Sequence, residues 1–293
     1  MDYLFDDLKG HEDKTIFVIG NGFDLFHGLP SSYRHFRHCL IGSGKDKFVS
    51  EMESIFSKKL NDEFLLWKDF EEALGEFNID ELFLHYTEGI DRINDERTRT
   101  VAQEKIHSTT SEIVPLLKDW ASEIERSKIN KILPLTSQSK YLTFNYTLTL
   151  ESAYGIPSDN ICHIHGRYSD SSIVVGHCNY VNKQQIEDSE YDFYEEEAKK
   201  GLADEMNSLR KDSMTIADNH QRFFDGIKEF DRIVILGHSL SEIDYNYFGR
   251  IRRKVNNNAH WHIAKHSPED EERIGRFLTK FKITASNRWI FNF

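Results

Sequence analysis

The sequence has little cysteine, little proline and no long apolar run, and each scarcity excludes a class of protein. Its three cysteines, Cys39, Cys162 and Cys178, are too few and too scattered for the disulfide framework of a small secreted domain. No stretch approaches the roughly 20 consecutive apolar residues of a membrane-spanning helix. The five prolines form no linker that would divide the 293 residues into independent domains. Residues 1–14, MDYLFDDLKGHEDK, are acidic and lack the basic-then-apolar order of a signal peptide, so we expect a cytoplasmic protein.

Basic residues are also outnumbered, since 37 Lys and Arg face 49 Asp and Glu and the formal net charge is −12. Such a chain repels nucleic acid on average, because non-specific binding depends on neutralising phosphates. The basic runs YRHFRH at 33–38 and RIRRK at 250–254 are typical of solvated helix faces. One cleft can still be locally positive, so a small anionic ligand such as a nucleotide remains compatible with this composition.

Short β-branched and aromatic runs predict buried strands at residues 15–19, 140–144, 161–165, 172–176, 232–237, 260–264 and near 288–293. Helical patterns lie between them. This alternation predicts an α/β domain with a Rossmann-like, mostly parallel sheet covered by helices. Residues 45–130 contain no convincing strand but carry apolar stripes at helical spacing, Phe64 to Phe77 and Ile113 to Ile124. We therefore expect one nucleotide-binding domain over residues 1–293, with helical insertions at about 45–130 and 183–228.

The first strand leaves through a glycine-rich turn in FVIGNGFDLFHGLP, residues 17–30. A strand that passes through Gly20-Asn21-Gly22 into a helix lets the backbone approach a ligand, and the helix N-terminus attracts phosphate. The third glycine of the dinucleotide fingerprint is replaced by Leu25, which argues against an ordinary dehydrogenase. The structural alternative is a tight turn that needs glycine only for its dihedral angles.

Polar residues follow three further predicted strands. Asn145 follows one in LTFNYTLTLE, His163 and His165 share one face of another in CHIHG, and Gly237-His238-Ser239 end a third in LGHSLSEIDYNYF. If these strands are neighbours, the groups converge, because ligands bind beyond the carboxyl ends of open α/β sheets.

Each of these residues also has a structural explanation. Asn145 can cap a turn, and His165 can be a hydrogen-bonded core residue. Ser241 and Asp244 spell the S-x-x-D capping box, which would explain Asp244 without a ligand.

Together IGNGFDLFHGLPSSYRHF, W-x-D-F-E at 67–71, FNYTLTLE, HIHG and GHSLSEID resemble the AbiH family of bacterial abortive-infection, anti-phage proteins, from about residue 14 to 250. The same order of motifs is similar, more distantly, to sirtuin-like (SIR2) domains, which in defence proteins hydrolyse NAD. The resemblance implies an NAD glycohydrolase with Asn145 and His165 as catalytic residues. It implies nucleotide-binding roles for Gly20, Asn21, Gly22, Phe23, Asp24, Gly237, His238, Ser239 and Asp244.

Two departures from the sirtuin-like pattern are Asn21, where alanine is usual, and Thr147, where an aspartate is usual. The four-cysteine zinc module is missing, which argues against protein deacetylation. We expect NAD as substrate, no required cofactor and no bound metal. We also expect a phage-derived trigger and a homo-oligomer as possible partners.

Three alternatives remain open. The turn could bind a nucleotide as a sensor or effector without hydrolysis. Ser239 in G-x-S-x-S could be the nucleophile of a serine hydrolase, with Asp244 or Asp270 and one of the histidines 260, 262 and 266. A zinc site could form from Cys162, His163, His165, His177 and Cys178, although their spacing matches no common zinc motif.

Overall fold

The computed structural model describes residues 2–56, 66–89, 96–124, 129–187 and 193–293. The chain forms two compact units. The first comprises Met1–Ser31, Ala121–Ile173 and Asp212–Phe293, and the second comprises Ser32–Trp120 and Val174–Lys211. The expected scheme, in which residues 1–293 form one domain with helical insertions at about 45–130 and 183–228, stays a prediction. Among the described residues, no helix is both long and apolar enough to cross a bilayer.

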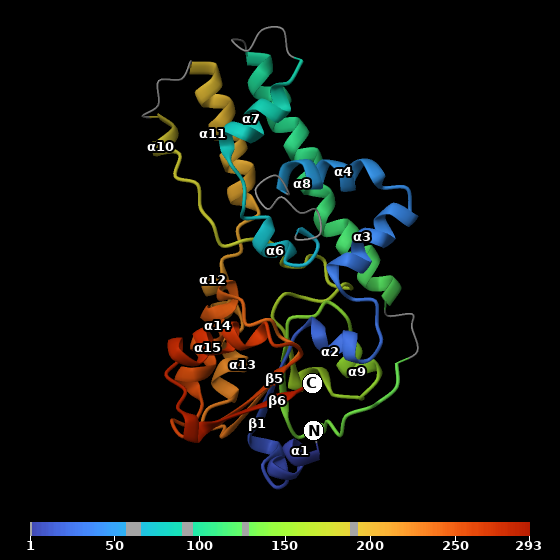
Figure 1. The fold of residues 1–293 in the computed structure, drawn as a ribbon, viewed down its shortest axis with the longest axis vertical. Helices are drawn as coiled ribbons and strands as arrows, with labels where there is room; N and C mark the ends of the chain where they lie inside the picture. Colours follow the sequence, from blue (N-terminus) through green and yellow to red (C-terminus); the bar gives the residue numbers. More distant parts are fainter. Residues whose placement is uncertain (1, 57–65, 90–95, 125–128, 188–192) are drawn as a thin grey trace. The chain divides into compact units, whose positions relative to one another are not determined.

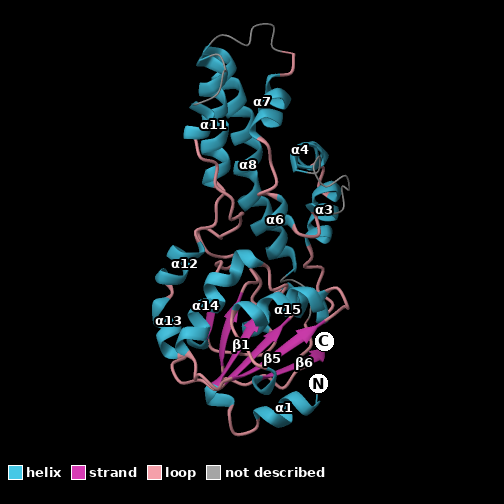
Figure 2. Ribbon diagram, turned by 60° about the vertical axis from the view of Figure 1, so that its left-hand side comes forward, coloured by secondary structure: helices cyan, strands magenta, loops and turns pink. Residues whose placement is uncertain are grey.

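The first unit contains one parallel sheet of six strands, drawn as magenta arrows in Figure 2. The strands are β1 (Thr15–Ile19), β2 (Lys140–Thr143), β3 (Ile161–His163), β4 (Arg232–Leu236), β5 (His260–Lys265) and β6 (Arg288–Asn292). Their order is β3-β2-β1-β4-β5-β6, and every neighbouring pair is parallel. This confirms the Rossmann-like α/β prediction. The order of strands reverses between β1 and β4, which is where ligands bind in such sheets.

Both faces of this sheet are covered, as the alternation of β1 requires. Ile16 and Val18 belong to a core packed against α13 (Gln221–Gly226), α14 (Tyr245–Lys254) and α15 (Asp270–Lys280). Phe17 and Ile19 belong to a core on the other face, with residues of α1 (Asp2–Leu8), α2 (Asn21–Phe26) and α9 (Thr149–Ser152). Figure 1 shows α13 to α15 on one side of the strands and α2 with α9 on the other. Continuous apolar runs therefore become central strands because both of their faces are buried.

The remaining helices of the first unit are α12 (Ser213–Asn219) and short 3-10 turns at Glu12–Lys14, Ser158–Asn160, Glu242–Asp244 and Ala285–Asn287. The second unit holds α3 (Tyr33–Gly42), α4 (Asp46–Phe56), α6 (Phe70–Ala73), α7 (Ile79–Thr87), α10 (Gln184–Glu187) and α11 (Phe193–Ser208). The long helix α8 (Glu96–Ile124) lies in it up to Trp120. Ser32 caps α3 by accepting from the backbone N–H of His35.

The residues of the W-x-D-F-E motif pack inside the second unit. Trp67 and Phe70 stack at 5.5 Å between ring centroids, and Phe36 packs edge-on against Trp67. Glu71 pairs at 2.7 Å with Lys211, whose side chain is fully buried. No strand forms in the described part of residues 45–130, as expected; Phe64, part of the predicted apolar stripe, lies outside the described residues.

The predicted strand at 172–176 is wrong. Ile173 is buried, but within the described ranges the sheet ends at β3 and this apolar run pairs with no strand. Its neighbour His177 makes an isolated bridge to Arg210. At Gly176 an added Cβ would lie 1.8 Å from the carbonyl oxygen of Leu209, so the glycine permits this close contact between two chain segments.

Candidate functional site

The glycines after β1 and β4 bring the two turns into backbone contact. Gly20 N–H donates to Leu236 O at 3.0 Å, and Gly22 N–H donates to Gly237 O at 2.8 Å. A Cβ on Gly22 would lie 2.7 Å from Gly237 Cα, and one on Gly20 would lie 2.5 Å from His238 Cα. Gly237 has φ +64° and would clash in the same way. The glycines are therefore needed for turn-to-turn packing as well as for local dihedral angles.

This packing uses the backbone donors that were expected to bind phosphate. Gly20 and Gly22 donate across to the β4 turn, and Phe23 N–H donates to Gly20 O at 2.9 Å. Phe23 is fully buried in the core, while Asn21 and Gly22 keep intermediate exposure at the edge. In this conformation the N–H groups of Gly20, Gly22 and Phe23 donate to the protein's own carbonyls, so a ligand at this edge needs other groups to hold it.

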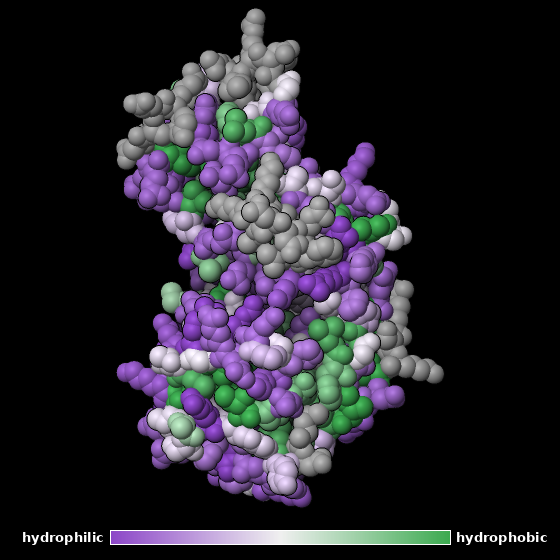
Figure 3. Space-filling view, viewed as in Figure 1, coloured by the Kyte–Doolittle hydropathy of each residue, from purple (hydrophilic) through white to green (hydrophobic). Residues whose placement is uncertain are grey.

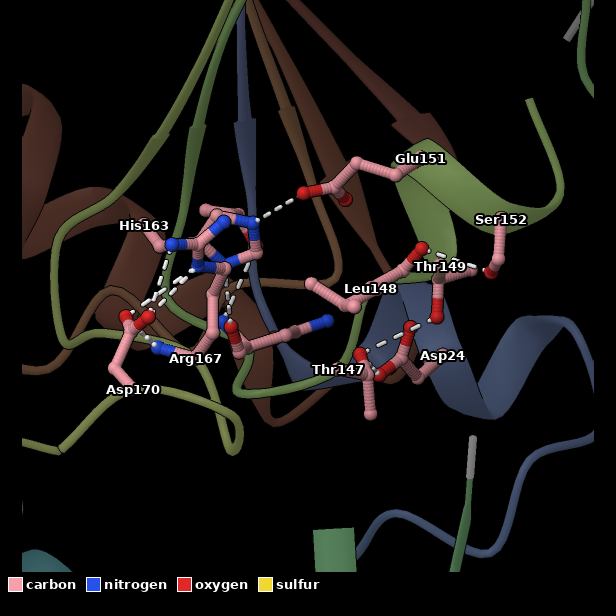
Figure 4. Close-up of polar contacts among 11 residues, drawn as sticks. Asp24, Thr147, Leu148, Thr149, Glu151, Ser152, His163, Arg167 and Asp170 are labelled. Carbon is pink, nitrogen blue, oxygen red and sulfur yellow. Dashed lines mark hydrogen bonds and ion pairs between the residues drawn. The ribbon is translucent and has the colours of Figure 1, made fainter. Parts of the chain in front are cut away.

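Asp24 points into the interior and joins the first two strand ends. It is 1% exposed, and its Oδ2 accepts from Thr147 Oγ1 at 2.6 Å, while Thr149 Oγ1 donates to Thr147 Oγ1 at 3.2 Å (Figure 4). Thr147 stands where the sirtuin-like pattern has an aspartate. The threonine suits this position because a carboxylate there would face Asp24 without a shared donor.

His27 of the same opening motif is a second structural link. Its Nδ1–H donates to Phe23 O at 2.7 Å, so Nε2 accepts from Tyr154 Oη at 2.6 Å. Burial lowers the pKa of His27, which favours this neutral tautomer. Beside it, Leu25 and Phe26 are 40% and 37% exposed, and Figure 3 shows apolar surface gathered around α2 and the C-terminus.

Asn145 is held at the end of β2 by three contacts. Its backbone N–H donates to Thr143 Oγ1, its side-chain Nδ2–H donates to Gly20 O at 3.2 Å, and its carbonyl oxygen lies 3.3 Å from His163 Nδ1. The amide thereby bridges the ends of β2 and β1. Its Nδ2 is committed to Gly20, so Oδ1 is the amide atom that could accept from a ligand.

His163 and His165 do not share a strand face, which corrects the expectation. The strand ends at His163, and Gly166 N–H donates to His163 O at 3.0 Å to close a tight turn in which Gly166 has φ +80°. The turn sends the two imidazoles to different partners: His163 faces Glu151, and His165 faces Asp244.

The carboxylate of Asp244 lies between two imidazoles from two strand ends. Its Oδ2 is 3.4 Å from His238 Nε2, and its Oδ1 is 4.0 Å from His165 Nε2. All three side chains are at most 10% exposed. Ser241 makes no side-chain capping bond, so the capping box is not what explains Asp244. Desolvation strengthens these charge–dipole contacts relative to those at a surface.

The loop after β4 fixes the tautomer of His238. Leu240 N–H donates to His238 Nδ1 at 2.9 Å, so the proton of a neutral imidazole is on Nε2, facing Asp244. Leu240 has φ +56°, a backbone region that costs a leucine roughly 1–2 kcal/mol. Strain of this kind persists only where the surrounding structure enforces it, and it clusters at functional sites.

Phe144 separates the two imidazoles. Its ring centroid is 5.1 Å from that of His165 and 4.3 Å from that of His238, both edge-to-face, and Tyr247 lies 5.7 Å from His165. The structure thus joins Asn145 to Gly20, and His165 to Asp244 and His238. A shared cleft for Asn145 and His165, bordered by Gly22 and Ser239, stays a prediction.

A second polar cluster contains His163 together with Glu151, Arg167 and Asp170, three residues whose part in the site the sequence did not indicate. His163 Nε2 lies 2.9 Å from Glu151 Oε1, and Arg167 pairs with Asp170 at 2.9 Å (Figure 4). Burial alone would raise the pKa of Asp170, but hydrogen bonds from Arg167 and the nearby charges of Arg167 and His163 bring it below its ordinary value. Glu151 lies within FNYTLTLE, so its place in that motif was the available signal.

The residues of the serine-hydrolase and zinc-site alternatives lie in different parts of the chain. Ser239 is exposed, and His262 on β5 faces Asp7 of α1 at 3.2 Å, so a serine hydrolase would have to use His260 or His266 as its base, and this alternative stays a prediction. Cys162 Sγ lies 3.3 Å from His220 Nδ1, but burial raises the pKa of Cys162 to about 12 and keeps the thiol neutral. Within the described ranges, no group of three His, Cys, Asp or Glu side chains is arranged to hold a metal ion.

An all-parallel sheet of this order, with polar side chains gathered beyond the carboxyl ends of β3, β2, β1 and β4, defines a Rossmann-like α/β protein with a candidate site at its switch point. The chain belongs to the AbiH family: residues 16–265 match the family model described as bacteriophage abortive infection AbiH. Membership confirms the resemblance to the AbiH family and assigns the protein to bacteriophage abortive infection, while the sirtuin-like similarity stays a prediction. A search of the curated proteins found no match.

Proposed function

We propose that the carboxyl edge of the sheet binds a nucleotide of the NAD class and hydrolyses its nicotinamide glycosidic bond as the chemical step of abortive infection. The proposal is supported by the buried carboxylate of Asp244 between His165 and His238, at the sheet edge where Asn145 bridges the ends of β2 and β1. A purely structural edge would not need a buried carboxylate set between two imidazoles.

The residues divide the chemistry between them. Nδ1 of His238 accepts from Leu240, so His238 serves to hold Asp244. With Nε2 of His165 turned toward Asp244, Nδ1 is the nitrogen that takes a proton from water or a ribose hydroxyl. Oδ1 of Asn145 orients that hydroxyl.

The reaction balances without a cofactor. The water oxygen forms a bond to the ribose C1′ while the C1′–N bond to nicotinamide breaks. The bonding electron pair passes into the pyridinium ring and neutralises it, so the leaving group needs no proton. The proton of the attacking water goes to His165, whose imidazolium Asp244 stabilises.

Purified full-length protein incubated with NAD tests the proposal, with nicotinamide release followed by chromatography. His165→Ala and Asn145→Ala should each lower the rate by about 100-fold or more, the usual effect of removing a positioned proton acceptor or polar contact. His262→Ala is the matched control, because His262 and His165 are equally buried at 3% exposure but His262 faces Asp7 on another part of the sheet. It should retain release per folded molecule.

Phage infection supplies the second arm, because an abortive-infection protein acts after infection. Cellular NAD should fall in infected cells that express the wild-type chain and stay constant with His165→Ala. If the purified protein binds NAD and releases it unchanged, and cellular NAD stays constant after infection, the proposed hydrolysis is wrong and the nucleotide sensor is favoured.

A further inference from the structure

The imidazole of His163 lies between two hydrogen-bond acceptors. Nδ1 is 3.3 Å from the backbone oxygen of Asn145, and Nε2 is 2.9 Å from the carboxylate oxygen Oε1 of Glu151. The His163 side chain is 9% exposed, so water does not substitute freely for either contact. A neutral imidazole carries one N–H and can satisfy only one acceptor.

Both acceptors are therefore satisfied at once only when the pair of His163 and Glu151 shares one proton in addition to the one on the neutral ring. Either both ring nitrogens are protonated, or the proton sits on Glu151 and is donated to Nε2. In each arrangement Nδ1–H remains and donates to the carbonyl of Asn145. The contact with Glu151 thus holds the ring in place and keeps a proton on Nδ1 for the carbonyl of Asn145.

The pair also has a cost that its packing does not explain. Oε2 of Glu151 is buried and has no hydrogen-bond partner among the described residues. A buried carboxylate oxygen without a donor destabilises the folded chain. Arg167 is near enough for the charge of Glu151 to help raise the Arg167 pKa, after the larger effect of its hydrogen bond to Asp170. An arrangement kept at such a cost is consistent with a role in positioning.

We propose that His163, oriented by Glu151, is the positioning residue that holds Asn145 in place for the reaction. Asn145 is the bridge between β2 and β1, and its carbonyl has His163 as its partner while its amide is tied to Gly20. Loss of the Nδ1–H contact frees the peptide after Asn145 to rotate and shifts Oδ1. The inference rests on the proposed function only for the statement that Asn145 acts on substrate.

Conservative variants separate positioning from simple packing. In His163→Asn the side-chain Nδ2–H takes the place of the histidine Nδ1–H. In Glu151→Gln the amide N–H can donate to His163 Nε2, which leaves Nδ1–H for Asn145. Both should keep Asn145 in place, whereas His163→Ala should not. His11→Ala is the matched control, because His11 pairs with Asp231 at 3.2 Å elsewhere in the same unit.

The first measurement is independent of catalysis: the ¹H–¹⁵N signal of the Asn145 side-chain amide in the full chain. His163→Ala should shift or broaden it, and His163→Asn, Glu151→Gln and His11→Ala should leave it near its wild-type position. An unchanged signal in His163→Ala overturns the inference, even if the protein hydrolyses NAD.

The second measurement is the kinetics of nicotinamide release. His163→Ala should lower kcat by about 100-fold, the cost of misplacing a reacting group by roughly 1 Å, with KM nearly unchanged. His163→Asn should recover most of kcat. A loss in His163→Asn equal to that in His163→Ala overturns the inference. Absence of hydrolysis by the wild type refutes the proposed function instead, and the amide signal still decides the positioning.

Discussion

Replacing Gly22 with alanine puts a methyl group where the turn after β4 passes. The new Cβ would lie 2.7 Å from Gly237 Cα, 3.0 Å from Gly237 O and 3.2 Å from its carbonyl carbon. Carbon atoms in contact sit about 3.5–4.0 Å apart, so the two turns must separate by roughly 1 Å. None of the three atoms belongs to a side chain that could rotate away.

The cost has two parts. Overpacking that forces a backbone shift usually costs about 1–3 kcal/mol. A separation of this size also breaks the 2.8 Å bond from Gly22 N–H to Gly237 O, which contributes about 1 kcal/mol. The free energy of unfolding should therefore fall by about 2–4 kcal/mol, and the Tm by roughly 5–15 °C for a unit of this size. The sequence indicated that Gly22 lets the backbone approach a ligand; the structure predicts that a side chain at this position lowers stability.

Gly275→Ala is the matched control. Gly275 lies in the interior of α15 in the same unit, and a Cβ there would meet nothing within 4 Å. Alanine should stabilise the helix by about 0.5–1 kcal/mol, because glycine loses more backbone entropy on folding. Differential scanning fluorimetry and urea unfolding of the three proteins give both values. A Gly22→Ala protein as stable as the wild type would refute the reasoning, since it would mean that the two turns are not in contact.

Three shorter predictions concern other buried groups. Burial, with the charges of neighbouring basic residues, lowers the pKa of His262 to about 4, so the unfolded state takes up the proton at a higher pH than the folded state does. The free energy of unfolding, measured in urea, should therefore fall by about 2 kcal/mol from pH 7 to pH 5. His262→Gln should make this pH dependence weaker. Thr147→Val removes a donor from a buried carboxylate and should cost about 2 kcal/mol by urea unfolding, more than Thr149→Val, which removes a bond between two hydroxyls. Iodoacetamide at pH 8 should alkylate the exposed Cys178 but reach the buried Cys162 only after denaturation, as read by mass spectrometry.

The strands were predictable where an apolar run could be buried on both faces. Thr15–Ile19 and Arg232–Leu236 form as expected, because each lies between neighbouring strands and beneath helices on both sides. The run at 172–176 has a similar composition but no strand to pair with. Strand pairing is a property of the topology, and periodicity in one segment carries no information about whether a partner edge exists.

The sequence could predict which residues lie at strand ends near the candidate site, but not which side chains contact one another there. The sequence indicates that Asn145, His165 and Gly237-His238-Ser239 lie at the ends of their strands, and the parallel sheet then brings these ends to one edge. It could not indicate that Asp244 faces two histidines, since this depends on the 3-10 turn at Glu242–Asp244 and on the unusual backbone of Leu240. Such φ values come from tertiary constraint and leave no pattern in the residue types.

The motif residues differ in what they do with their polar atoms, and this gives a way to interpret variants across the family. Gly20, Gly22 and Asp24 use their backbone or side-chain groups in hydrogen bonds to other parts of the chain. A change at any of them should therefore lower stability first, and activity only as a consequence. Asn145 Oδ1 and the imidazole of His165 remain as the groups proposed to meet a ligand. Changes there should lower activity more than stability, as expected for residues that a protein keeps for chemistry. In a plot of toxicity against Tm for single variants, variants at stabilising positions should lose toxicity only as their Tm falls, whereas variants at Asn145 and His165 should lose toxicity at a nearly unchanged Tm. Variants of the opening GNGFD motif that lose toxicity at an unchanged Tm would restore the phosphate-binding role first inferred from its glycines.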